Sequence, residues 1–150
     1  MKVINYFFSE RREHWLAEIG KSDWSAGQFL YNLLQDGKLQ DFIGENAMVM
    51  LLVNDDELLS FCTFAEKDDI QPTELTPWIG FVYTFPQYRG HHYAEKLFSE
   101  IKRIAIANNV RQAYISTDHM GLYEKYGCEF CRMMNDINGE PSRVYIMRFE

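Results

Sequence analysis

A short segment in the second half of the chain combines residues that could bind a phosphate group. It lies between an apolar run ending near residue 85 and a helical pattern starting near residue 91. A glycine-containing turn at such a junction leaves backbone N–H groups free at the positive end of a helix dipole, and an arginine adds a forked cation. The segment consists of Arg89, Gly90, His91, His92, Tyr93 and Ala94. Alone, it fits a tight strand-to-helix connection better than a phosphate site.

Histidine and cysteine residues provide little basis for a metal site. His91 and His92 could donate to a phosphate, or both could be solvated loop side chains, but adjacent imidazoles supply too few ligands in suitable directions for a metal. Cys128 and Cys131 have Cys-x-x-Cys spacing, and only Cys62 remains elsewhere, so there is no second pair. We therefore expect no metal, and we expect the cysteines to pack as small apolar groups.

Two segments, in order along the chain, resemble the two signatures of the Gcn5-related N-acetyltransferase (GNAT) superfamily. Residues 81–94, FVYTFPQYRGHHYA, resemble its acetyl-CoA-binding segment, Gln/Arg-x-x-Gly-x-Gly/Ala, with Arg89 first and Ala94 last. Residues 116–128, STDHMGLYEKYGC, resemble its second signature, Leu-Tyr-Glu-Lys-x-Gly-Phe, with Cys128 replacing the phenylalanine. The ordered pair of segments is far more specific than either one.

His92 departs from the family pattern, which usually has glycine at this position. Glycine allows backbone angles and a close ligand approach that a residue with a Cβ does not. Histidine fits there if position 92 already lies in the first helical turn, where φ is negative. The helical spacing predicts a helix beginning at His91, which would satisfy this condition.

The resemblance implies direct attack of an amine on acetyl-CoA, with both substrates bound at once. It places the cofactor against the 89–94 segment and against Val82, Tyr83 and Thr84, where backbone N–H groups near Val82 and Thr84 could stabilise charge on the thioester oxygen. It also implies that Tyr123 lies near the thioester sulfur as the general acid. A tyrosine pKa of about 10 keeps that proton in place at pH 7. The alternative is that Tyr123 only fills the edge of the core.

The residue that deprotonates the amine is not evident from the sequence. Many GNAT members have a glutamate on the strand before the cofactor loop, but none is present between Trp78 and Phe85. Asp118 and His119 are the first candidates, because the strand end before them should face the acceptor. Asp118 is equally well explained as the N-cap of a short helix.

Composition limits the partners and the compartment. The net charge of −7 argues against a broad cationic face, so neither nucleic acid nor an anionic membrane is an expected partner. No apolar run approaches the roughly 18 residues that span a bilayer, and the first ten residues lack a signal-peptide core. Three cysteines in a chain of this size fit a reducing compartment, so a cytoplasmic location is expected.

Hydrophobic spacing predicts the elements that position these residues. Helical spacing covers residues 9–19, 25–34 and 91–109, with a shorter helix over 121–126. Ser9 is a candidate N-cap of the first helix, and Gly20 ends it. Alternation and short apolar runs predict strands over residues 47–53, 58–65, 78–85, 111–116, 129–136 and 143–149.

The order of these elements predicts the architecture. Strand 78–85, helix 91–109 and strand 111–116 form a βαβ unit whose strands should be parallel, and the flanking strands form hairpins. We therefore predict one α/β (α+β) GNAT-like domain over residues 1–150. It has a mixed, mostly antiparallel sheet, a central βαβ acetyl-CoA-binding unit and flanking helices.

The resulting functional prediction is an N-acetyltransferase that uses acetyl-CoA as cosubstrate and a primary amine of a small molecule as acceptor. A protein N-terminus or a lysine side chain is the alternative acceptor. A non-catalytic CoA-binding module is the alternative of a different class, motivated by the missing strand glutamate and by His92. A homodimer is left open.

Overall fold

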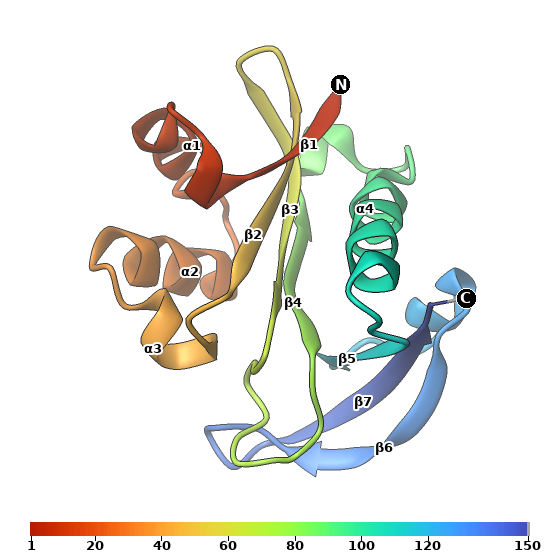
Figure 1. The fold of residues 1–150 in the computed structure, drawn as a ribbon. Helices are drawn as coiled ribbons and strands as arrows, with labels where there is room; N and C mark the ends of the chain where they lie inside the picture. Colours follow the sequence, from red (N-terminus) through yellow and green to blue (C-terminus); the bar gives the residue numbers. More distant parts are fainter. Residues whose placement is uncertain (150) are drawn as a thin grey trace.

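The computed structural model describes residues 1–149, and its centre is one seven-stranded sheet in the order β1-β2-β3-β4-β5-β7-β6 (Figure 1). Every pairing in this sheet is antiparallel except that of β4 with β5. The predicted mixed, mostly antiparallel sheet is confirmed. The strands are β1 (Lys2–Asn5), β2 (Met48–Asn54), β3 (Glu57–Ala65), β4 (Trp78–Thr84), β5 (Gln112–Thr117), β6 (Glu129–Asn135) and β7 (Pro141–Arg148).

Helices cover both faces of the sheet. Figure 1 shows α1 (Arg12–Ile19), α2 (Ser25–Gln35) and α3 (Leu39–Ile43) on one side and α4 (Tyr93–Ala107) alone on the other. The apolar stripe of α4 is buried against the sheet, with Leu97 and Ile101 fully enclosed, because its apolar residues recur at a helical period. Helix α4 connects β4 to the parallel β5, so the predicted βαβ unit is also confirmed.

Strands β4 and β5 diverge soon after they begin to pair. Their parallel register contains only Trp78 opposite Tyr114 and Ile79 opposite Ile115, although β4 continues to Thr84. The second half of β4 therefore has no strand neighbour on its β5 side among the described residues. Its backbone groups on that side therefore take no part in strand pairing.

A β-bulge lies where β4 leaves β5. Thr63 pairs with Gly80 and Phe61 with Tyr83, so two residues of β4 stand opposite one of β3. Phe81 has a φ of 50°, which is uncommon for a bulky residue. The bulge places Phe81 against the α1–α3 side of the sheet, whereas the neighbouring Val82 packs on the α4 side.

The structure corrects the first predicted helix and adds small elements. Ser9 does not cap α1, because its hydroxyl accepts the N–H of Arg11 in a turn and α1 begins only at Arg12. Neither the four-residue β1 nor the five-residue α3 was predicted from the hydrophobic spacing. The short helix over 121–126 is a 3-10 helix, η3 (Tyr123–Tyr126), and two others are η1 (Tyr6–Phe8) and η2 (Pro86–Tyr88).

The remaining predicted elements are found within two residues of their expected bounds. Over residues 1–149, no helix combines the length and the apolar character needed to cross a membrane.

Candidate active site

The 89–94 segment lies at the N-terminus of α4, as predicted. Helix η2 ends at Tyr88, Gly90 turns the chain with a φ of 88°, and α4 begins at Tyr93. The conformation at Gly90 lies in the left-handed region, which glycine adopts without steric cost. The turn and the 15-residue helix place free N–H groups and the positive end of a dipole beside the divergence of β4 and β5.

The side chain of Arg89 contacts two residues of β4. Its Nε donates a hydrogen bond of 2.9 Å to the carbonyl oxygen of Thr84, and its guanidinium lies 5.5 Å from the ring centre of Tyr83. The Nε edge of the guanidinium group is therefore fixed by this hydrogen bond, while the side chain as a whole stays exposed. The other guanidinium donors could bind a phosphate oxygen.

His92 does not lie in the first helical turn. It is the N-cap of α4 with φ 59° and ψ 33°, so the expectation of a negative φ is wrong. This left-handed conformation costs an L-residue about 1–2 kcal/mol and is the one that glycine would supply freely. Both histidines are exposed; His91 stacks on Tyr93 at 5.3 Å, and His92 Nδ1 lies 3.9 Å from Glu95.

Tyr123 opens η3 and is only 5% exposed. Its ring packs at the end of the α4-side core against Phe98, Tyr126 and Tyr145. Burial, and to a smaller extent nearby thiols and the carboxylate of Asp68, raises the pKa of Tyr123 well above its usual range. The hydroxyl therefore keeps its proton throughout the neutral range.

The cysteines are free and, in part, buried. Cys62 and Cys128 are enclosed and Cys131 is half-buried. Burial raises the pKa of Cys128 to about 11, so it is a protonated thiol at neutral pH. Within residues 1–149, no group of three or more His, Cys, Asp or Glu side chains is placed to hold a metal ion.

On the opposite side of the sheet from α4, a cavity of about 470 Å³ opens at the divergence of β4 and β5. Four aromatic side chains line it: Trp24, Phe29, Phe42 and Phe81. Three carboxylates also line it: Asp68, Asp69 and Asp136. The β5 end contributes Ser116, so the cavity touches both diverging strands.

Asp68 is the more deeply placed carboxylate, with 6% exposure. It occupies the space that a side chain at Gly80 would need, since a Cβ there would lie 2.0 Å from Asp68 Oδ1. Burial and the neighbouring charge of Asp69 raise the pKa of Asp68 well above its usual range. Of the two carboxyl groups, Asp68 therefore has the stronger tendency to hold a proton.

Asp69 is half-buried and faces the same cavity. Within the described chain, its Oδ1 is buried and has no hydrogen-bond partner. Burial raises the pKa of Asp69, and the charge of Asp136 adds to this, while a hydrogen bond from Ser116 lowers it. A carboxylate with a raised pKa and a free acceptor atom is suited to take a proton from a cationic ligand.

The family model of the Acetyltransferase (GNAT) family matches residues 6–128. The chain belongs to this family. It is therefore a member of a class of acetyl-CoA-dependent acyltransferases, which confirms the family predicted from the two signatures. Among curated protein sequences, none matches this chain.

Solved structures share the GNAT fold at low sequence identity. An aminoglycoside 6'-N-acetyltransferase from Enterococcus faecium has a TM-score of 0.70 at 11% identity, covering 100% of this chain and 98% of its own. An aminoglycoside 6'-N-acetyltransferase complexed with coenzyme A has a TM-score of 0.67 at 10% identity, with coverages of 100% and 98%. A ribosomal-protein-alanine N-acetyltransferase from Brucella melitensis has a TM-score of 0.59 at 12% identity, covering 99% of each chain.

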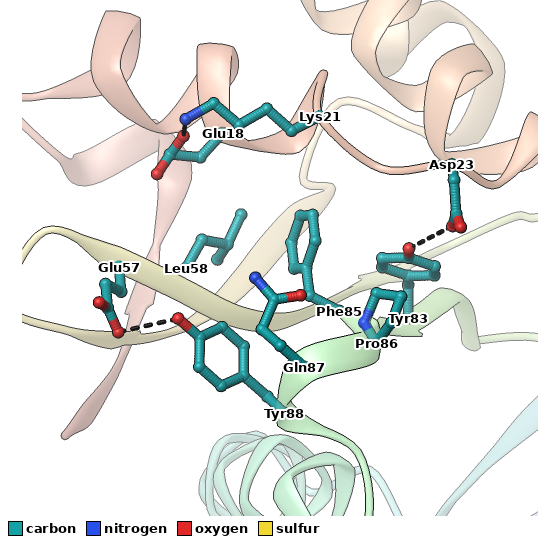
Figure 2. A pocket seen from close by; sticks show the side chains of 10 residues that line it. All are labelled: Glu18, Lys21, Asp23, Glu57, Leu58, Tyr83, Phe85, Pro86, Gln87 and Tyr88. Carbon is teal, nitrogen blue, oxygen red and sulfur yellow. Dashed lines mark hydrogen bonds and ion pairs between the residues drawn. The ribbon is translucent and has the colours of Figure 1, made fainter.

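In this GNAT domain, the side chain of Tyr83 turns away from α4. It stacks on Trp24 at 5.6 Å, and its hydroxyl donates to Asp23 at 2.6 Å. Figure 2 shows this bond at the edge of a second cavity of about 270 Å³, where the Tyr88 hydroxyl donates to Glu57 at 2.8 Å. Of Tyr83, only the backbone can face a cofactor bound on the α4 side.

Asp118 and His119 lie in the exposed loop after β5, and neither lines the carboxylate cavity. The His119 N–H donates to Thr117 Oγ1 at 3.1 Å, and the residue that precedes η3 is Leu122. The alternative role of Asp118 as a helix N-cap is therefore wrong. The structure does not bring this pair together with the acidic cavity of the GNAT domain.

Asp68 and Asp69 were not predicted as site residues from the sequence, because they lie in a polar segment with two prolines that predicts only a loop between strands. The signal that could have indicated a site was a pair of adjacent acids three residues beyond the end of a strand. Their approach to Gly80 and Ser116 depends on tertiary structure, and no local pattern contains it.

Proposed function

We propose that this GNAT protein transfers an acetyl group from acetyl-CoA to the primary amine of a small molecule, by direct attack in a ternary complex. The observation that supports this most strongly is the carboxylate pair Asp68–Asp69, which lines an aromatic cavity at the divergence of β4 and β5. Acidic groups with raised pKa values in a concave pocket are typical of proton-transfer sites.

Acetyl-CoA would bind on the α4 side of the gap. Its phosphates would meet the 89–94 turn and the fork of Arg89, and its thioester would lie along the free edge of β4. Backbone N–H groups near Val82 and Thr84 are the candidates for stabilising negative charge on the thioester oxygen. The coenzyme A complex of a protein with the same fold supports this cofactor.

The acceptor would bind on the other side of the gap. Its ammonium group, with a pKa of about 10, must lose a proton before attack. Asp69 is the proposed base, because its Oδ1 lacks a partner in the described structure and its pKa is raised by burial. Asp68 would stay protonated beside it and hold the pair together. We propose Asp69 in place of Asp118 and His119, which lie outside the cavity.

Tyr123 is the proposed group at the leaving sulfur. Its raised pKa makes it a weaker acid than a thiol, whose pKa is about 8.5. It would therefore stabilise the departing thiolate by donating a hydrogen bond, and the thiolate would take its proton later from solvent. Tyr123→Phe should lower the rate of acetyl transfer by about 10-fold or more without weakening acetyl-CoA binding.

The volume of the cavity, about 470 Å³, lies in the range of small-molecule sites, which favours a small acceptor over a protein N-terminus or a lysine side chain. The experiment is to measure acetyl-CoA-dependent thiol release with a panel of primary amines, alongside thermal stabilisation by acetyl-CoA. We expect a shift with the cofactor and turnover with at least one small amine. Stabilisation without turnover of any amine would support the CoA-binding module, and turnover of peptides alone would support a protein acceptor.

A further inference from the structure

The cavity exposes apolar surface that the rest of the chain does not cover. Phe29 is 40% exposed and Ile137 is 45% exposed, and both line it. They come from different elements, since Phe29 lies on α2 and Ile137 lies in the turn between β6 and β7. Large apolar side chains left exposed inside a concave site mark a surface that a ligand covers.

The aromatic side chains form one continuous wall. The ring of Phe29 contacts Phe42 edge to face with centres 5.4 Å apart, and lies 6.2 Å from the ring of Phe81. Two of these rings come from α2 and α3, which lie on the same side of the sheet (Figure 1), and the third comes from the bulge of β4, which faces that side. The bulge matters because it turns Phe81 into the cavity. Aromatic faces bind flat apolar groups and attract cations.

The carboxylates form the other end of the cavity. The Ile137 N–H donates to the backbone oxygen of Asp69 at 2.8 Å, so the β6–β7 turn and the acidic loop are fixed to each other. One carboxylate oxygen of Asp136 already has hydrogen-bond partners, because its Oδ1 accepts the N–H groups of Asn138 and Glu140. Asp69 Oδ1 is buried and lacks a partner among residues 1–149, so it is the acceptor atom that a ligand donor would satisfy.

We infer, on the basis of the proposed function, that the acceptor is a primary amine with an aromatic or apolar substituent, such as an arylalkylamine. The ammonium group meets Asp69 at the gap, and the substituent lies on Phe29, Phe42 and Phe81. A polyhydroxylated amine matches the aromatic part of this lining poorly, because the rings leave its hydroxyl groups without hydrogen-bond partners.

The test compares amines that differ only in their substituent. Initial rates of thiol release would be measured at saturating acetyl-CoA with 2-phenylethylamine, ethylamine, spermidine, kanamycin and a peptide with an N-terminal alanine. We expect the highest kcat/KM with 2-phenylethylamine, at least about 10-fold above ethylamine, because the ring adds apolar contact that ethylamine lacks. A higher kcat/KM for spermidine, kanamycin or the peptide would overturn the inference and leave acetyl transfer itself intact.

A variant at the aromatic wall links this preference to the cavity. Phe29→Ala should lower kcat/KM for 2-phenylethylamine by about 10-fold and that for ethylamine by less than about twofold. Phe29→Leu, which keeps the fold while removing the ring, should give a smaller loss in the same direction. Phe8→Ala is the matched control, since Phe8 is 85% exposed outside the cavity.

An unchanged ratio of the two amines in both Phe29 variants would overturn the inference. If acetyl-CoA stabilises the protein but no amine is turned over, the proposed function has failed, and the acceptor class fails with it. The two failures are distinguishable, because the first leaves turnover intact and the second abolishes it in the unmodified protein.

Discussion

The two sides of the β4–β5 divergence are built in contrasting ways. The proposed cofactor side is a contiguous turn, residues 89–94, which is largely exposed and offers backbone N–H groups and an arginine. The proposed acceptor side is assembled from α2, α3, the Asp68–Asp69 loop, both diverging strands and the β6–β7 turn. It offers carboxylates against aromatic rings. The proposed cofactor site is therefore local in sequence, whereas the proposed acceptor site is not.

The largest loss of stability is expected from a side chain placed at Gly80, where Asp68 already fills the space. Gly80→Ala would place a Cβ 2.0 Å from Asp68 Oδ1. The carboxylate must move, so we expect a loss of about 1–3 kcal/mol in unfolding free energy and a fall in turnover of about 100-fold. Acetyl-CoA affinity should change little. Urea unfolding, thiol release and cofactor titration measure the three quantities.

A double variant separates the steric effect from the chemical one. Asp68→Ala combined with Gly80→Ala removes the clash, so stability should recover while turnover stays low. If turnover recovers together with stability, the carboxylate of Asp68 has no part in the reaction.

On the cofactor side, Arg89→Ala should weaken acetyl-CoA binding by about 10-fold, since a charge-assisted hydrogen bond contributes about 1.5–3 kcal/mol. The unfolding free energy should fall by less than about 1 kcal/mol, because Arg89 is exposed and loses one hydrogen bond to Thr84 and one contact with the ring of Tyr83. Calorimetric titration of acetyl-CoA checks the affinity. Arg103→Ala, an exposed arginine of α4 paired with Glu100, is the control. Loss of stability without loss of affinity would make Arg89 a structural residue.

The burial of Asp68 should also make the unfolding free energy depend on pH. Its pKa is raised in the folded state, so the folded protein holds that proton more tightly than the unfolded chain. The unfolding free energy should therefore fall as pH rises from about 4 through the folded pKa. Asp68→Asn removes this pH-dependent loss. Its unfolding free energy should exceed that of the unmodified protein by on the order of 1 kcal/mol at pH 7 and by little at pH 4. Urea unfolding at both pH values tests it; an equal change at both would contradict the raised pKa.

The smallest effect is expected at His92. Glycine adopts the left-handed conformation of this residue without the steric cost that histidine has, but it loses more entropy on folding. His92→Gly should therefore raise the unfolding free energy by about 0.5 kcal/mol, as measured in urea. His91→Gly is the control, because position 91 has no positive φ and should show no gain. Destabilisation by His92→Gly would mean that the imidazole makes a compensating interaction.

The sequence predicted most of the fold because its signals were local. The period of α4 and the two glycine-marked turns needed no tertiary information, and they located the 89–94 segment and Tyr123. The bulge at Phe81 could not be predicted, because it depends on the register between β3 and β4. The position of Asp69 could not be predicted either, since the atoms around it come from strands far away in sequence.

In the proposed mechanism, Asp69 activates the acceptor in a site separate from the cofactor loop. Asp69→Asn tests it directly when turnover at saturating acetyl-CoA and acetyl-CoA affinity are measured on the same preparation, with Asp118→Asn as the control. We predict that Asp69→Asn lowers turnover by about 100-fold or more with unchanged affinity, and that Asp118→Asn changes neither. Full turnover in Asp69→Asn together with its loss in Asp118→Asn would contradict the claim.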